Sequence, residues 1–75
     1  MTFSEAKKWV STNNGSVRKM SRTADHIYFQ IAIGPHVSDG VGVEHGGRQS
    51  ILESDPEYQK AFVLMVQSLK AKIPG

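Results

Sequence analysis

Hydrophobic residues recur at helical spacing near the start of the chain. The first such set consists of Phe3, Ala6, Trp9 and Val10. This spacing predicts a helix over about residues 3–13 with one apolar face. Thr2 and Glu5 have the spacing of a capping box at its start, and residues 13–15, Asn-Asn-Gly, favour the left-handed geometry that ends a helix.

The C-terminal part of the chain predicts a second, longer helix. Residues 54–57, Ser-Asp-Pro-Glu, provide a capping side chain, a proline for the first turn and an acid near the positive end of the helix dipole. The apolar stripe that follows consists of Tyr58, Phe62, Met65, Val66, Leu69 and Ile73. Lys70 and Lys72 suit the negative end of the dipole, and Pro74-Gly75 ends the helix.

Between the two helices, alternating apolar and polar residues predict three strands. The clearest strand is residues 26–33, because its side chains point alternately to the two faces of a sheet. Residues 17–22 form the preceding strand, and residues 41–44 form the third strand after a polar loop over residues 34–40 that a Gly-Pro pair begins. Residues 49–53 either extend the third strand or form a short fourth one, and the sequence leaves these two alternatives open.

The order of elements is α-β-β-β-α, and the predicted fold class is α+β: a three-stranded antiparallel sheet with two helices packed on one face. With 75 residues, the chain is expected to form a single compact domain over residues 1–75. This order and length are similar to those of double-stranded-RNA-binding domains, and Gly34-Pro35-His36 resembles part of that family's central loop. That family begins its last helix with a Lys-Lys-x-Ala-Lys type of motif, whereas residues 54–60 read Ser-Asp-Pro-Glu-Tyr-Gln-Lys. No family is therefore assigned, and no residue role is carried over.

One face of the predicted sheet is left uncovered by the helices, and the register predicts its residues. Pairing Arg22 with His26, and Ile33 with Val41, turns one set toward the helices: Val17, Ile27, Phe29, Ile31, Ile33, Val41 and Val43. The candidate binding residues on the opposite, open face are Arg18, Met20, Arg22, His26, Tyr28, Gln30 and Arg48, joined there by Gly42 and Glu44. Arg, Tyr and Met are enriched in interfaces, which favours a binding surface, although Tyr and Arg also suit an ordinary solvated sheet face.

A second candidate surface lies on the C-terminal helix. Val63 and Leu64 fall outside its apolar stripe, among polar residues. They are candidate interface residues for a homodimer or for a partner that binds in a groove. The alternative is that the first helix covers Leu64 through Trp9 and Phe3, and that Val63 is simply exposed.

Composition and charge narrow the function classes. Without cysteine, the chain has no disulfide, zinc-thiolate site or thiol nucleophile. The net charge is +2, with five basic residues and one acidic residue in positions 1–24, one basic and six acidic in 25–57, and three basic in 58–75. Nine basic residues spread in this way are weak support for non-specific nucleic-acid binding. No apolar run approaches the ~20 residues of a membrane span and no signal peptide is visible, so we expect a cytoplasmic protein.

Residue types that support catalysis or hold a metal are not grouped along the sequence. His26, His36 and His45 are ten and nine positions apart, which is not the spacing of a metal site. The glycines near position 42 match no phosphate-binding motif, and no acid stands at a recognisable spacing from Ser50 and His45. We therefore expect no enzyme activity, no metal and no cofactor.

The sequence thus predicts a small non-enzymatic binding protein that acts as an adaptor, regulator or inhibitor by protein–protein interaction through the open sheet face. Tyr28 and Met20 are the expected apolar anchors, and Arg18, Arg22 and Arg48 are the expected donors of charge-assisted hydrogen bonds. The alternative is a nucleic-acid-binding module that uses the same basic and aromatic face. A homodimer through the C-terminal helix is a further expectation, and no membrane partner is expected.

Overall fold

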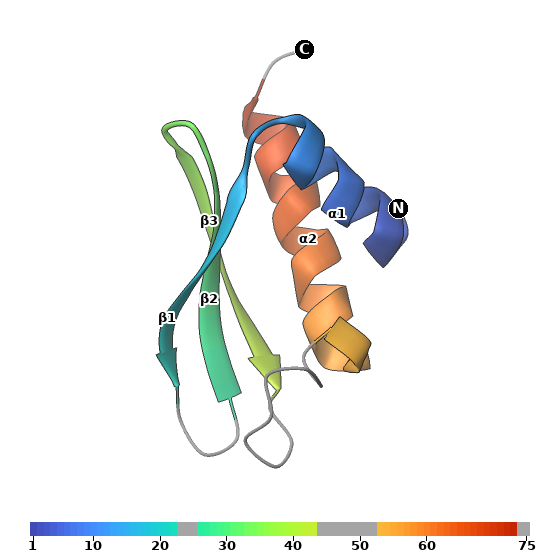
Figure 1. Ribbon diagram of the computed structural model, residues 1–75, viewed down its shortest axis with the longest axis vertical. Coiled ribbons are helices and arrows are strands. Elements are labelled where there is room, and N and C mark those ends of the chain that lie inside the picture. The colour runs from blue at the N-terminus through green and yellow to red at the C-terminus, as the bar shows by residue number, and fades with distance from the viewer. Residues whose placement is uncertain (23–25, 44–52, 74–75) are drawn as a thin grey trace.

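The computed structural model describes residues 1–22, 26–43 and 53–73 (Figure 1). Its elements are α1 (Phe3–Thr12), β1 (Ser16–Arg22), β2 (His26–Ile33), β3 (His36–Val43) and α2 (Pro56–Lys72). The three strands form one antiparallel sheet in the order β1-β2-β3, and both helices lie against the same side of it. The predicted α-β-β-β-α fold is therefore confirmed. The fourth strand or strand extension expected near residues 49–53 lies almost entirely outside the described residues.

Both helices begin as their sequences predict, and α1 also ends as predicted. Pro74-Gly75, which are expected to end α2, lie outside the described residues. In the capping box of α1, the Thr2 backbone N–H donates to Glu5 Oε1 at 2.8 Å, and the Glu5 backbone N–H donates to Thr2 Oγ1 at 3.1 Å. The bond from the Thr2 backbone lowers the pKa of the Glu5 carboxyl, because it stabilises the charged form. Asn14, with φ of 56°, takes the left-handed conformation just after α1. Asp55 caps α2 by accepting the Glu57 backbone N–H at 2.8 Å.

The core lies between the sheet and the two helices. Its buried hydrophobic residues are Ala6, Val10, Ile27, Phe29, Ile31, Ile33, Tyr58, Phe62, Met65, Val66 and Leu69. α2 packs mainly over β3, and α1 packs beside α2, so β1 is the edge strand farther from α2. Val17 pairs with Ile31 but is 45% exposed, so its predicted place in the core is wrong. The reason is that the helices do not extend far enough to cover β1.

The pairing of β1 with β2 follows the predicted register over only part of its length. Val17 pairs with Ile31 and Arg18 with Gln30, as expected. A shift between Lys19 and Ser21, typical of a β-bulge, then offsets the pairing by one residue. Arg22 therefore stands opposite Ile27, and the predicted pairing of Arg22 with His26 is wrong.

The predicted third strand begins too late. β3 starts at His36, and the chain reverses in a turn of two residues. Gly34 has φ of 58°, and the ring of Pro35 fixes φ near −65°, which are the signs of a type II′ turn. Ile33 pairs with His36 in place of Val41. The Gly-Pro pair, interpreted as the start of a loop, is therefore a tight hairpin turn.

This five-residue difference in register exchanges the two faces of β3, because side chains alternate along a strand. Val41 lies opposite Tyr28 and is 43% exposed, and Gly42 lies opposite Ile27 and is buried. The predictions that Val41 belongs to the core and Gly42 to the open face are both wrong. Val43 pairs with exposed His26, whereas the predicted register pairs it with Ile31.

Tyr58 is expected to make the free energy of unfolding depend on pH in the alkaline range. Burial raises the pKa of its phenol above the ordinary value of 10.0, and the charge of Glu53 raises it further. The unfolded state therefore loses this proton first, so the free energy of unfolding falls as the pH rises above about 10. We expect Tyr58→Phe to reduce this loss in urea denaturation between about pH 8 and pH 12. A variant that loses stability with pH as steeply as wild type would contradict this assignment.

Candidate functional site

The face of the sheet turned away from the helices is the larger candidate surface. In β2, buried residues alternate with four that face the other way: His26, Tyr28, Gln30 and Ala32. The register adds the residues directly opposite them on the neighbouring strands, because directly opposed residues of an antiparallel pair share a face. We define the open face by its described side chains: Ser16, Arg18, His26, Tyr28, Gln30, Ala32, Val37, Asp39 and Val41.

The open face is ordered in rows that cross the sheet. The first row, Ser16–Ala32–Val37, is next to the turn between β2 and β3. The second row is Arg18–Gln30–Asp39, which we call the charged row. The third row places Tyr28 beside Val41. Within the charged row, Gln30 Nε2 donates to Asp39 Oδ1 at 3.0 Å, so the amide and the carboxylate hold each other in place.

The rows on both sides of the charged row expose large apolar side chains. Tyr28 and Val37 are each 40% exposed, and Val41 is 43% exposed. The helices cannot cover these residues, because both helices lie on the other side of the sheet. A single exposed valine is ordinary, but three exposed apolar side chains on one side of a three-stranded sheet make this face a candidate contact surface.

The structure brings together some of the predicted binding residues. Arg18, His26, Tyr28 and Gln30 share the open face, as expected. Met20 lies at the bulge in β1, Arg22 stands opposite Ile27, and Arg48 lies outside the described residues. Only the predicted pairing of Arg22 is wrong, and the predicted binding roles of Met20, Arg22 and Arg48 stay untested.

Sequence reasoning missed Val37 and Asp39 and placed Val41 in the core. A signal for all three was present, since Val37, Asp39, Val41 and Val43 alternate with small or polar residues from the Gly-Pro pair onward. This alternation indicates a strand that begins directly after the turn, with its valines on the opposite side from its glycines.

The charge of the open face is balanced among its described side chains. Arg18 supplies one positive charge and Asp39 one negative charge, on the two edge strands. The sequence predicted a basic face with three arginines and a single acid. The difference arises because the shift in β3 brings Asp39 onto this face and the bulge in β1 changes the register of Arg22.

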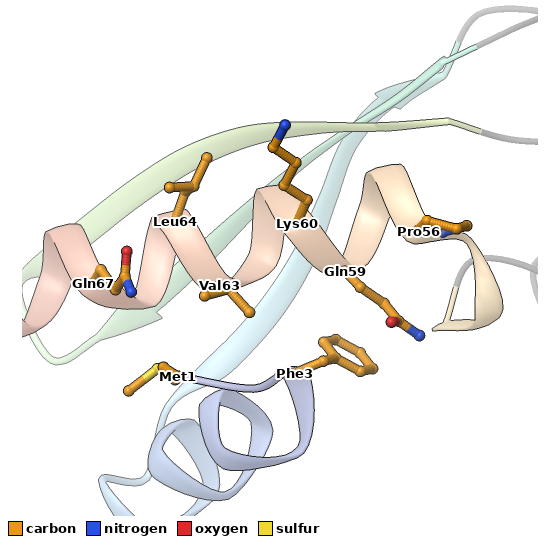
Figure 2. A pocket seen from close by; sticks show the side chains of 8 residues that line it. All are labelled: Met1, Phe3, Pro56, Gln59, Lys60, Val63, Leu64 and Gln67. Atoms are coloured by element: carbon orange, nitrogen blue, oxygen red, sulfur yellow. The ribbon is translucent and has the colours of Figure 1, made fainter.

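A second candidate surface is an open, shallow groove of about 440 Å³ between the start of α1 and α2 (Figure 2). Val63 points toward Met1 and Phe3, whereas Leu64 points away from α1. Val63 is partly buried against the core, and Leu64 is 57% exposed. Both predicted interface residues line this groove, although their side chains point in different directions, and their role in an interface stays a prediction. The alternative in which α1 covers Leu64 is wrong, because α1 lies beside Val63.

The described residues show neither a metal-binding cluster nor a helix that could span a membrane. These residues contain no group of three His, Cys, Asp or Glu side chains placed to hold a metal ion. His26 is on the open face, and His36, opposite Ile33, is on the helix side of the sheet, so the register separates them; His45 lies outside the described residues. Neither described helix combines the length and the apolar character that crossing a membrane requires.

The fold and the open face define a small α+β protein with one covered and one uncovered sheet surface. No family model matches the chain, and no curated protein or solved structure matches it.

Proposed function

We propose that this chain is a non-enzymatic binding protein that recognises another protein through its open face. The observation that carries the proposal is the exposure of Tyr28, Val37 and Val41 on the side of the sheet without helices. Burial of a valine-sized side chain contributes about 1.5–3 kcal/mol when it is complete. Tyrosine is also among the residues that most often dominate the energy of protein interfaces.

The buried residues behind this surface hold it in place, which favours binding without rearrangement. The residues that alternate with Tyr28 and Gln30 are Ile27, Phe29 and Ile31, and these are fully or almost fully buried. The hydrogen bond between Gln30 and Asp39 also fixes two polar side chains before a partner arrives. A surface ordered in advance loses less conformational entropy when it binds.

Charge favours a protein partner over a nucleic acid. A nucleic acid is held by several Lys or Arg contacts to phosphate groups. Among the described side chains of the open face, Arg18 is balanced by Asp39, and the carboxylate would repel a phosphate backbone. A protein surface with apolar residues and both signs of charge is the better complement.

Val41→Lys is expected to weaken partner binding about 100-fold or more, because the new charge would be desolvated beside Tyr28 in an apolar contact. Leu64→Lys is the matched control, since it adds the same side chain at an exposed apolar residue of α2. Tagged chains would capture the partner from an extract of the source cells, and the purified partner would then be titrated against wild type and both variants by calorimetry. We expect Leu64→Lys to bind within about twofold of wild type.

Two results would contradict the proposal. If Val41→Lys binds as wild type does while Leu64→Lys does not, the binding surface is the groove beside α2. If the captured partner is a nucleic acid whose affinity falls steeply with salt, the protein-binding function is wrong.

A further inference from the structure

The positions of the two charges in the charged row favour one particular occupant of the open face. Gln30 is at its centre on β2, Arg18 is on β1 and Asp39 is on β3. Since neighbouring strands are about 4.8 Å apart, the two charges are attached about 10 Å apart and on opposite sides of a neutral residue. A complementary surface must carry the same two charges, at the same spacing, in the reverse order.

A second copy of the chain provides this reversed row. A two-fold axis that runs parallel to β2 and passes above Gln30 exchanges the two sides of the face. It sets Arg18 of each copy opposite Asp39 of the other, which gives two ion pairs, and it sets Tyr28 opposite Tyr28. An axis perpendicular to β2 would place Arg18 against Arg18 and Asp39 against Asp39, and like charges opposed in this way are destabilising.

The twist of the sheet is compatible with this axis. Figure 1 shows the three strands crossing as the sheet twists. A twisted sheet has the shape of a saddle, and a two-fold rotation about a line parallel to its central strand carries one saddle onto a parallel one. The two faces therefore stay about 10 Å apart along their length, the usual spacing of packed sheets.

We infer that the open face binds a second copy of this chain, face to face, about a two-fold axis parallel to β2. The inference rests on the proposed function, because it requires this face to be a protein-binding surface. Three strands of about eight residues present a footprint of roughly 400 Å² per copy, about half of a standard interface. The dimer is therefore weak, and a partner protein that offers more contact area displaces it.

Charge reversal tests this arrangement. Arg18→Glu alone and Asp39→Lys alone each create two like-charge pairs, and we expect each to weaken self-association about tenfold or more. An equimolar mixture of the two variants restores both ion pairs between unlike chains, so it is expected to associate as wild type does. The double variant Arg18→Glu with Asp39→Lys should likewise dimerise. Sedimentation equilibrium from about 10 μM to about 1 mM, at low and high salt, measures all five samples.

The outcomes separate this inference from the proposed function. The inferred dimer is wrong if the wild-type chain stays monomeric at about 1 mM. It is also wrong if the mixture associates no better than either single variant. If Val41→Lys still abolishes binding of another protein in that case, the proposed function stands. If Asp39→Lys does not fold, the self-association of Arg18→Glu is compared with that of Arg18→Lys. Only Arg18→Lys keeps the ion pair with Asp39, so only this variant should dimerise.

Discussion

Replacing Gly42 with alanine is expected to destabilise the fold by about 2–3 kcal/mol, although alanine is normally the better residue in a strand. A Cβ atom at this position would lie 2.8 Å from Cδ2 of Tyr58 and 3.4 Å from its Cβ. The ring of Tyr58 cannot easily move, because its centroid is 4.8 Å from that of Phe29 and 6.0 Å from that of Phe62. Chemical denaturation of wild type and Gly42→Ala measures the difference in unfolding free energy.

Gly40 provides the comparison for this prediction. A Cβ atom there would overlap Sδ of Met65, but a methionine side chain has other rotamers and an aromatic ring held by neighbours does not. We therefore expect a smaller cost for Gly40→Ala, and a double variant with Met65→Ala that is more stable than the sum of the two single changes predicts. If Gly42→Ala is as stable as wild type, α2 does not pack on the backbone of β3 as described.

These two glycines also explain where the sequence was misleading. Glycine and proline most commonly indicate loops and open surface, and the sequence prediction follows this common meaning. In β3 the absence of a side chain serves packing, because it lets Tyr58 and Met65 of α2 lie directly on the strand. This role depends on residues 16 to 25 positions away in the chain, so no local pattern around Gly40 and Gly42 could show it.

The elements that were predicted correctly are those governed by local physics. The capping box of Thr2 and Glu5 and the cap at Asp55 involve residues a few positions apart, so the sequence states them directly. The alternation in β2 is equally local, and it correctly placed Tyr28 and Gln30 opposite the core. Pairing between strands is not local. One bulge in β1 and one unrecognised turn before β3 therefore changed which residues share the open face.

The altered register changes what the surface can bind. The predicted surface combined three arginines with Tyr28, which suited a nucleic acid as well as a protein. The described surface has Val41 beside Tyr28 and a balanced charged row, and this balance is the basis of the proposed self-association. The proposed protein recognition and the proposed self-association therefore both rest on the register that the structure shows.

Phe29→Ala is expected to cost about 3–5 kcal/mol, the largest effect of any single truncation that we predict. Phe29 is 1% exposed, and its ring packs against Tyr58, so removal leaves a cavity between the sheet and α2. A domain of this length has a total stability of only about 4–11 kcal/mol. The variant should therefore melt at least about 15 °C below wild type, as followed by circular dichroism.

Tyr28→Ala is the matched control, because Tyr28 is the adjacent aromatic residue in the same strand and points to the opposite face. It is 40% exposed, and no helix covers it, so we expect its loss to change stability by less than about 1 kcal/mol. The same change should abolish binding through the open face, since it removes the central aromatic anchor. The two substitutions thus separate folding from recognition: Phe29→Ala acts on stability, and Tyr28→Ala acts on binding with the fold intact. A Tyr28→Ala variant that melts as early as Phe29→Ala would show that the sheet has no open face.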